Sequence, residues 1–353
     1  MAIMSIPTIV LGGTGYVAGE LLRLIVGHPH LQIVGVMSES RAGQPIDSIF
    51  PQLQDSLGNM CFGSKREIMD LLEEGQTALF SAAPHGVSAA LVDDFVTTAK
   101  QVNCQLSVVD VSADFRYSRA ADFEAVYEIP HGAPDLLSAF SCAVPEHQLS
   151  TARPHIGHPG CFATALLMAA VPLMKLGIAD TDLYAVGITG STGSGRTPTT
   201  GTHHPERHSN LFAYKALEHR HTPEVVGICK SITGIQPELR FIPHSGPFSR
   251  GIYVTMQANL KRPQSDIEIR GALQDFYTAS PFVVVRESAP RIKDVVGSNY
   301  CHIGIAADEK SVAVFVVIDN LVKGAAGGAM QWMNRQLDLA ETTGLLAPAL
   351  AWV

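Results

Sequence analysis

The sequence predicts an α/β protein with an N-terminal Rossmann dinucleotide-binding domain and an α+β catalytic domain containing a mixed sheet. It opens with a strand, a glycine-rich turn and a helix, and strand and helix signals alternate from there to about residue 145. The middle of the chain is richer in strands. We expect residues 1–155 to bind the dinucleotide and 156–322 to carry the catalytic groups and oligomer contacts. Residues 323–353 are expected to form a helix that returns to the first domain.

Composition excludes several classes of function. The 353 residues are enough for two cores, and a net charge of −8 without a basic stripe argues against nucleic acid. No apolar run is long enough to span a membrane, and the N-terminus shows no signal peptide pattern. None of the six cysteines forms a C-x-x-C pair, which favours a reducing, cytoplasmic compartment and gives no reason to expect a metal.

The first βαβ unit is the candidate cofactor site. Ile6–Leu11 reads as a buried strand, Gly12–Gly19 as a turn, Glu20–Ile25 as a helix and Leu31–Met37 as the second strand. This order places a pyrophosphate on a helix N-terminus, although a turn used only for packing is the alternative. The residues predicted to bind the cofactor here are Gly12, Gly13, Thr14, Gly15, Tyr16 and Val17.

The end of the second strand indicates NADP rather than NAD. The segment reads Ser38-Glu39-Ser40-Arg41, and two hydroxyls with an arginine suit a 2′-phosphate. We therefore predict that Ser38, Ser40 and Arg41 bind the 2′-phosphate. Glu39 does not fit this interpretation, and the alternative for Arg41 is a solvated surface side chain.

Two later strands end in residues suited to the same crevice. Thr77–Ala82 is followed by Ala83 and Pro84, a turn predicted to contact the cofactor. Ser107–Val111 is followed by Arg116, whose guanidinium fork suits a phosphate, although an Asp–Arg surface pair is the alternative. Turns at 130–134 and 144–145 are expected to carry the chain toward the second domain.

Cys161 is the candidate nucleophile. It follows Pro159-Gly160 and opens an apolar run of good helix formers, so it is expected at or near a helix N-terminus. Unpaired N–H groups and the helix dipole at that position favour a thiolate. The alternative is a small buried apolar residue, which most free cysteines are.

A second loop of glycines and serines follows the predicted strand Leu183–Thr189. Its sequence, Gly190 to Arg196, offers backbone N–H groups and a guanidinium. Gly193 is therefore a candidate for cofactor binding and Arg196 for substrate binding. A merely flexible loop is equally compatible with the sequence.

Two histidine clusters lie beyond this loop, at 203–208 and 219–221. Neither has an i, i+4 pairing with a carboxylate or a nearby cysteine, so a metal site is disfavoured. Thr222 is predicted as an N-cap and Pro223 as the first helical residue, which would fix His219 and His221 just before a helix. One of these two histidines is the candidate general acid–base group.

The remaining chain alternates strands with one long helix and ends in small residues. From Asp319 to Met330 a strand leads into a helix of small residues that allow close packing. The other expected strands are 251–257, 282–286, 302–306 and 311–318, and the expected helix is 264–279.

Seven stretches, in order along nearly the whole chain, resemble the N-acetyl-γ-glutamyl-phosphate reductase family, which is related to aspartate-semialdehyde dehydrogenase. They are Gly12–Glu20, Val109–Arg116, His158–Ala165, Gly190–Arg196, His219–Glu224, Gly297–Tyr300 and Asp319–Ala326. The resemblance implies reduction of an acyl phosphate by NADPH to an aldehyde and phosphate.

The resemblance also implies roles for single residues. Cys161 would form a thioester and His219 would be the acid–base group, with His221 and Glu224 as substrate-binding neighbours or alternates. Arg116 would hold phosphate, and Asn320 would face the nicotinamide amide.

Two departures from the family keep other substrates open. Phe162-Ala163 stands where the family more often has Tyr-Pro, and the segment at 203–207 resembles a sister group that reduces carrier-protein-linked aminoadipyl phosphate. Pro159-Gly160-Cys161 and the segment 193–196 favour the arginine-pathway enzyme. The further alternative is a non-catalytic NADP-binding protein; a small-molecule substrate and a homo-oligomer, dimer or tetramer, are expected for the enzyme.

Overall fold

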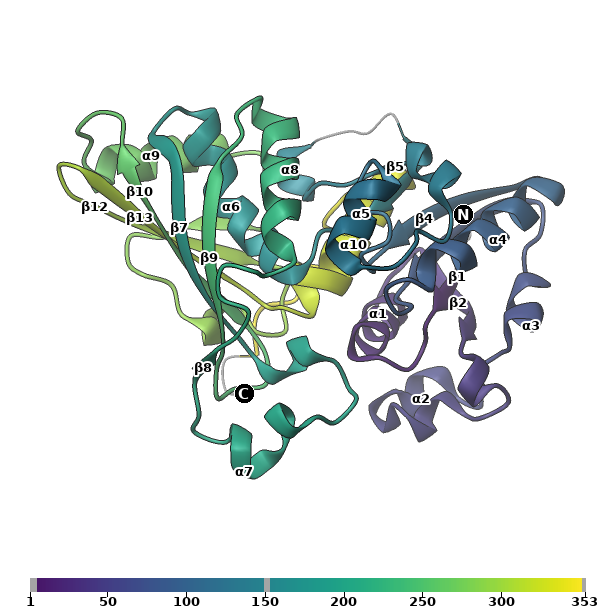
Figure 1. Ribbon diagram of the computed structural model, residues 1–353. Coiled ribbons are helices and arrows are strands. Elements are labelled where there is room, and N and C mark those ends of the chain that lie inside the picture. The colour runs from purple at the N-terminus through teal and green to yellow at the C-terminus, as the bar shows by residue number, and fades with distance from the viewer. Residues whose placement is uncertain (1–4, 149–152, 351–353) are drawn as a thin grey trace. The chain divides into compact units, whose positions relative to one another are not determined.

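The computed structural model describes residues 5–148 and 153–350, which form two compact units (Figure 1). The first unit comprises the described residues within 1–142, 150–158 and 326–345. The second comprises those within 143–149, 159–325 and 346–353. Unlike the predicted domain ranges, these units assign residues 143–148 and 346–350 to the second unit. No helix among the described residues is both long and apolar enough to cross a membrane.

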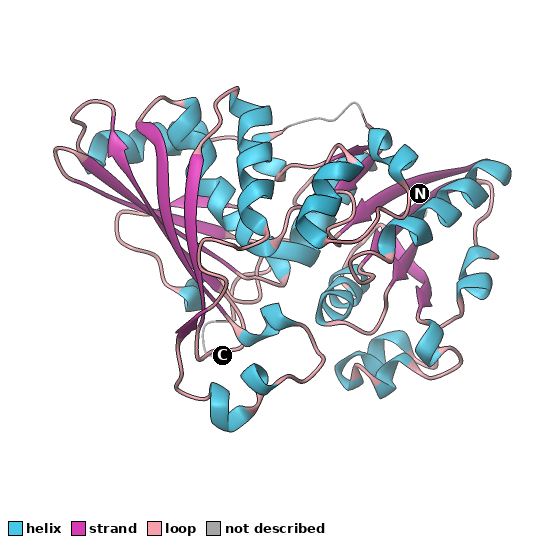
Figure 2. Cartoon of the chain, viewed as in Figure 1, coloured by secondary structure: helices cyan, strands magenta, loops and turns pink. Residues whose placement is uncertain are grey.

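The first unit is a six-stranded, fully parallel sheet flanked by helices (Figure 2). The strand order is β2-β1-β3-β4-β6-β5, so the order reverses between β1 and β3, where ligands bind in such sheets. The strands are β1 Ile6–Leu11, β2 Leu31–Met37, β3 Gly75–Ser81, β4 Cys104–Asp110, β5 Phe140–Ser141 and β6 His155–Gly157. The helices are α1 Tyr16–Val26, α2 Gln54–Leu57, α3 Lys65–Met69, α4 Ser88–Gln101, α5 Ala120–Tyr127 and α10 Gly327–Gln336.

Helix α1 begins four residues earlier than the sequence predicted. Gly19 was assigned to the turn but lies inside the helix, where an added Cβ would meet the Phe50 ring at 2.7 Å. Its lack of a side chain thus serves packing against Phe50. At the other end of the chain, α10 contacts α1 and β4, which confirms the predicted return of the C-terminal helix to the first domain.

The second unit contains a seven-stranded mixed sheet in the order β11-β12-β13-β10-β7-β9-β8. Its strands are β7 Ala179–Thr189, β8 Phe212–Ala213, β9 Glu238–Ser245, β10 Ile252–Leu260, β11 Val283–Val285, β12 Cys301–Ala307 and β13 Ser311–Ile318. Its helices are α6 Cys161–Lys175, α7 His204–Arg207, α8 His221–Thr233 and α9 Asp266–Phe276, with a π-helix at Val322–Ala326. The mixed sheet confirms the predicted fold class.

Helix α6 is the core of the second unit. It contacts β7, β10 and β13 on one side and α8 on the other, and all but its first and last residues are buried. A helix that is apolar all round has to be enclosed in this way. The opposite face of the sheet is more open: Tyr184 and Val186 of β7 are 50% and 42% exposed.

Candidate functional site

The structure places Cys161 as the first residue of α6, as the sequence predicted. Gly160 is the N-cap and provides no side chain to bond the first N–H groups, and the first turn holds no acidic residue. The positive end of the helix therefore acts on the thiol without a competing carboxylate in that turn, which favours the thiolate. Cys161 is also half-buried, whereas Cys229 and Cys301 are fully buried.

Glu224 fixes the turn that presents Cys161. One of its carboxylate oxygens accepts a hydrogen bond from the Gly160 N–H at 2.7 Å, and the residue is 2% exposed. Glu224 lies in the first turn of α8, where the helix dipole stabilises a negative charge. This contact makes Glu224 a support for the backbone just before Cys161, and its role in substrate binding stays a prediction.

The predicted start of α8 was wrong. Thr222 does not cap the helix, because α8 begins at His221 with Arg220 as the N-cap. The Thr222 N–H instead donates to the carbonyl of His219, which closes a turn just before the helix. His221 is therefore helical, and only His219 lies before the helix.

His219 is neutral at physiological pH. Burial lowers its pKa to about 4, and the charges of Arg220 and Lys215 act in the same direction. Its Nδ1 accepts the backbone N–H of His221 at 3.3 Å, which leaves the ring proton on Nε2. The ring packs edge-on against Phe162, the residue after Cys161, at a centroid distance of 5.8 Å. A neutral imidazole with an Nε2–H donor therefore packs on the residue next to Cys161.

Gly324, in the π-helix, packs directly on Cys161. A Cβ added to Gly324 would lie 2.8 Å from Cys161 Cβ and 3.1 Å from its Cα. No side chain fits between these two segments. The small-residue stretch that was predicted to allow close packing does so against Cys161 itself.

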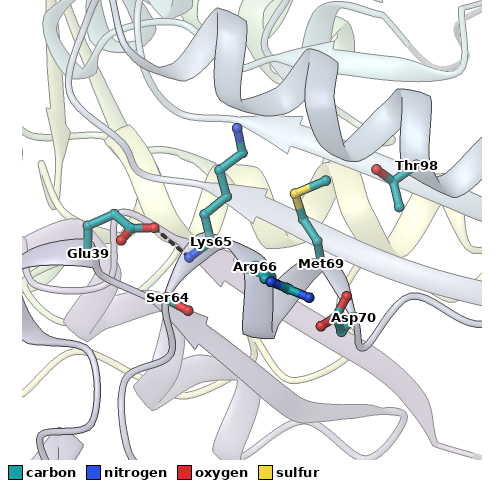
Figure 3. Close-up of a pocket in the computed structure, with 7 residues that line it drawn as sticks. All are labelled: Glu39, Ser64, Lys65, Arg66, Met69, Asp70 and Thr98. Carbon is teal, nitrogen blue, oxygen red and sulfur yellow. Dashed lines mark hydrogen bonds between the residues drawn. The ribbon is translucent and has the colours of Figure 1, made fainter.

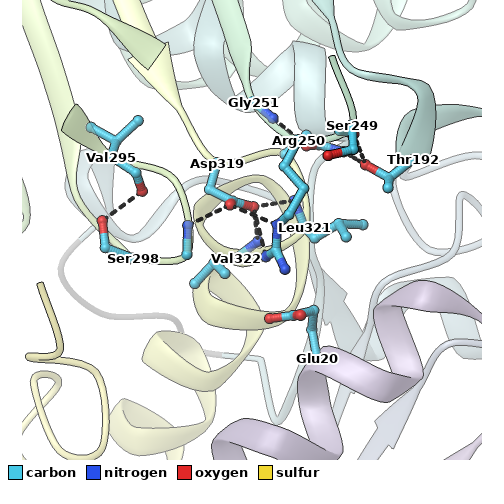
Figure 4. A network of polar contacts seen from close by, with 12 residues as sticks. Glu20, Thr192, Ser249, Arg250, Gly251, Val295, Ser298, Asp319, Leu321 and Val322 are labelled. Atoms are coloured by element: carbon cyan, nitrogen blue, oxygen red, sulfur yellow. Dashed lines mark hydrogen bonds and ion pairs between the residues drawn. The ribbon is translucent and has the colours of Figure 1, made fainter. Parts of the chain in front are cut away.

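Asp319 anchors the start of this segment through a dense polar network (Figure 4). The carboxylate is fully buried and pairs with Arg250, with an Nε–Oδ2 distance of 3.0 Å. It also accepts the backbone N–H groups of Leu321, Val322 and Gly297. A buried carboxylate with this many donors is a rigid fixed point.

Asn320 and the glycine–serine loop lie next to each other. The Asn320 Oδ1 accepts from Gly251 N–H at 2.8 Å, and its Nδ2 donates to Thr192 Oγ1 at 3.0 Å. Thr192 and Gly193 belong to a short 3₁₀ turn at Ser191–Ser194. The structure thus brings together two of the predicted cofactor contacts, Asn320 and Gly193, whereas Arg196 is exposed beyond that turn.

In the first unit, the predicted pyrophosphate turn meets the predicted Ala83–Pro84 turn at the point where the strand order reverses. Gly12 has φ +72°, and an added Cβ would lie 2.5 Å from the Ala83 backbone, so only glycine fits. At Gly15, the N-cap of α1, nothing lies within 4 Å of an added Cβ. Helix α1 has no capping side chain and no acid in its first turn, so its N-terminus at Gly13 to Val17 has the features that favour an anion.

Glu39 is directed away from the expected ribose position by a specific contact. Its Oε1 accepts the backbone N–H of Lys65 at the start of α3, 2.5 Å away (Figure 3). Both residues line a pocket of about 410 Å³ with Ser64, Arg66, Met69, Asp70 and Thr98. Ser38 and Ser40 lie with their hydroxyls 3.5 Å apart, and the exposed Arg41 donates to Gln44. Glu39 therefore no longer conflicts with a 2′-phosphate site.

Arg116 is buried and bonded to backbone. Its Nε donates to the His158 carbonyl and its Nη2 to the Val111 carbonyl, both at 3.0 Å. His158 precedes Cys161 by three residues, so Arg116 supports the segment that links strand β6 to Cys161. This position is compatible with the predicted phosphate contact and adds a support role that the sequence did not reveal.

Sequence reasoning missed three residues: Tyr214, Gly324 and Arg207. The Tyr214 ring packs on His219 at 5.8 Å, and burial raises the pKa of its hydroxyl. Gly324 was noted only as one of several small residues. Arg207 was read as part of a histidine cluster, and the sequence held no signal that it would be buried.

Comparison with known proteins agrees with this arrangement. Residues 8–140 match the NAD binding domain of semialdehyde dehydrogenase, and 161–320 match its dimerisation domain. An N-acetyl-γ-glutamyl-phosphate reductase of Bacillus cereus strain B4264 is 37% identical over 345 residues, which cover 95% of this chain and 97% of the relative. One from Acidithiobacillus ferrooxidans is 36% identical over 348 residues, covering 97% and 98%.

Solved structures share the fold at low identity. Aspartate semialdehyde dehydrogenase II of Vibrio cholerae, solved as a complex with ASA, aligns with a TM-score of 0.68 at 14% identity, covering 95% of this chain and 98% of that one. The enzyme of Candida albicans with NADP aligns with a TM-score of 0.67 at 17% identity, covering 96% and 99%.

The contact between Gly324 and Cys161 predicts the effect of a single methyl group. Gly324→Ala should displace Cys161 and lower its rate of alkylation by iodoacetamide at least severalfold, because overpacking shifts backbone by forcing neighbours apart. The rate is measured by mass spectrometry of the Cys161 peptide. Gly227→Ala, on α8 with nothing within 4 Å of an added Cβ, is the matched control. An unchanged rate in Gly324→Ala would contradict the packing constraint.

Proposed function

This chain belongs to the N-acetyl-γ-glutamyl-phosphate reductase family, and we therefore propose that it reduces N-acetyl-γ-glutamyl phosphate in arginine biosynthesis. The products are N-acetylglutamate 5-semialdehyde and phosphate, and the reaction passes through a thioester on Cys161. The observation that carries the catalytic assignment is the half-buried Cys161 at an uncapped helix N-terminus, with neutral His219 nearby. A cysteine suits this reaction because its thioester remains electrophilic enough to accept a hydride.

In the first step the Cys161 sulfur attacks the acyl carbon. A sulfur–carbon bond forms, and the carbon–oxygen bond to phosphate breaks with the electron pair leaving on phosphate. The proton that the thiol loses ends on the departing phosphate, and His219 is the proposed acid–base group. In the tautomer that its Nδ1 contact selects, the Nε2–H donates to the oxygen that becomes negative in the tetrahedral intermediate.

The second step returns the thiolate. Bound NADPH would supply the hydride that reduces the thioester. The resulting oxygen anion on the Cys161 adduct receives the same hydrogen bond from His219, and the sulfur–carbon bond then breaks to release the aldehyde. The leaving thiolate takes up a proton from water, which restores the thiol for the next turnover. The α6 N-terminus stabilises Cys161 as the leaving thiolate, so one feature of the fold assists both steps.

The residues of the first unit fit the cofactor. Gly13 to Val17 would hold the pyrophosphate on the open end of α1, and Ser38, Ser40 and Arg41 would hold the 2′-phosphate. Ala83 and Pro84 would border the same crevice, and Gly193 with Asn320 would contact the nicotinamide end. Arg116, Arg196 and His221 are the proposed substrate contacts, with Arg116 assigned to the phosphate.

We also propose a homo-oligomer in a cytoplasmic location. The match to a dimerisation domain covers the mixed sheet, and the sheet's open face exposes Tyr184 and Val186. Large apolar side chains exposed on a sheet face, as these two are, suit contact with a second copy of the chain. A reducing compartment keeps a nucleophilic thiol such as Cys161 in its active form.

The covalent mechanism predicts that Cys161→Ala abolishes acyl-phosphate reduction while NADPH binding persists, because the thioester cannot form. Activity is measured in reverse with NADP, phosphate and N-acetylglutamate semialdehyde, and NADPH binding by fluorescence. Cys104→Ala, at another half-buried cysteine, is the control and should remain active. An active Cys161→Ala variant would refute the mechanism. Activity of the wild type only with a carrier-linked aminoadipate semialdehyde would refute the substrate.

Arg41 provides a test of cofactor preference. Arg41→Ala should raise the KM for NADPH and leave NADH little changed, since a charge-assisted contact is worth roughly 1.5–3 kcal/mol. The ratio of kcat/KM for the two cofactors is the readout. Arg23→Ala, which removes an exposed arginine paired with Glu20, should leave the ratio unchanged. An NADPH preference equal to that of the wild type would remove Arg41 from the site.

The open sheet face predicts the location of the oligomer contact. Val186→Glu should dissociate the oligomer, because burying a carboxylate in an apolar interface costs several kcal/mol. Light scattering coupled to size exclusion measures the mass. Ile267→Glu adds the same charge at a 68% exposed position on α9 and should leave the mass unchanged. Equal masses for both variants would place the interface elsewhere.

A further inference from the structure

Arg207 is a buried cation without a carboxylate partner among the residues that the structure describes. It is the last residue of the short helix α7 and is 7% exposed. Its Nη1 donates to Ser245 Oγ at 2.7 Å and its Nη2 to the Phe248 carbonyl at 3.4 Å, both uncharged acceptors. Its Nε is buried and has no hydrogen-bond partner. Buried guanidinium groups are normally paired with an anion, so this one requires an explanation.

Ser245 brings Arg207 to the face of the sheet that carries the catalytic residues. Ser245 is four residues after Phe241 on strand β9, so the two side chains share a face, and both are buried. Phe241 packs on Phe162 at a centroid distance of 5.1 Å and on His219 at 5.5 Å. Ser245, which contacts Arg207, thus lies on the same side of β9 as Phe241, which packs on Phe162 and His219.

The strand register places Arg207 and Cys161 at the same end of that sheet. Ser245 pairs with Thr189, Thr189 with Ile252, and Ile252 with Ile318, so these four residues form one row across the strands. A Cβ added to Gly324 would meet both Ile318, at 3.3 Å, and Cys161. The row therefore runs from Ser245, which contacts Arg207, to Ile318, which lies beside Gly324 as Cys161 does.

Tyr214 supports this proximity from a third direction. Tyr214 follows strand β8, which pairs with the end of β9 at Phe212–Ser245. Burial is the largest cause that raises the pKa of the Tyr214 hydroxyl; a charge on Cys161 raises this pKa further, and the charges of Arg220 and Arg207 lower it. The half-buried Tyr214 side chain thus lies within electrostatic reach of both Cys161 and Arg207.

We propose that Arg207 binds the α-carboxylate of the substrate, an inference that rests on the proposed function. The substrate carries two anionic groups at opposite ends. The acyl phosphate has to lie at Cys161 for the reaction to occur. Arg207 contacts Ser245 and not Cys161, so the α-carboxylate is the substrate anion that we assign to Arg207. A guanidinium fork suits a carboxylate, and a substrate without one would leave the buried charge unpaired.

The test compares two substrates of the reverse reaction, N-acetylglutamate semialdehyde and its neutral α-amide, each with NADP and phosphate. The wild type should prefer the acid, and Arg207→Met should lower kcat/KM for the acid about tenfold to a hundredfold while leaving that for the amide nearly unchanged. The KM for phosphate should not change. Arg207→Lys should restore part of the preference. Arg119→Met, at an exposed arginine paired with Asp122, is the control and should behave as the wild type.

A structural role for Arg207 gives a different pattern. Ser245→Ala removes its hydroxyl partner but keeps the cation, so it should retain the preference for the acid. An equal loss on both substrates in Arg207→Met and Arg207→Lys, an increase in the KM for phosphate alone, or an unchanged acid-to-amide ratio would each overturn the proposal. A wild type inactive on both substrates would overturn the proposed function and this inference together, whereas an active wild type with an unchanged Arg207→Met ratio overturns only the inference.

Discussion

The hydrogen bond from the Gly160 amide to the Glu224 carboxylate fixes the turn before Cys161, and the arrangement of the candidate site depends on it. A serine or aspartate N-cap would bond the first N–H groups of α6 and reduce their effect on the thiol. Gly160 leaves those groups open, and the carboxylate that secures the turn comes from another helix, 64 residues away. The turn is therefore fixed from outside α6, and the first N–H groups of the helix beside Cys161 stay free of a capping side chain.

A second constraint acts from the opposite side of Cys161. Asp319 fixes the start of the π-helix, which brings Gly324 against Cys161, and Lys323 forms a fully buried ion pair with Glu146. A π-helix is uncommon and is frequently found at functional sites, because it alters which side chains face a neighbour. Cys161 is thus held between two elements whose own positions depend on buried carboxylates.

Much of the fold was predictable because its signals are local. The runs Ile6–Leu11, Leu31–Met37 and 311–318 coincide with strands, since buried strands are continuous apolar segments. The start of α8 was not predictable from Thr222-Pro223, because the turn before it is closed through His219. The role of Glu224 and the burial of Arg207 depend on residues far away in the chain, and no spacing rule reports such contacts. The local sequence correctly placed Cys161 at a helix N-terminus, whereas tertiary contacts determine how it is held.

The chain path through the two units has a consequence for dissecting this protein. Residues 143–148 belong to the second unit, although the segments on both sides of them in the sequence belong to the first. They supply Glu146, and its pairing with Lys323 is buried at both ends. An expression fragment that begins after residue 158 would lack that carboxylate and retain a buried ammonium, a loss of about 3–5 kcal/mol. The catalytic half is therefore not an autonomous folding module that can be excised or transplanted as one continuous piece.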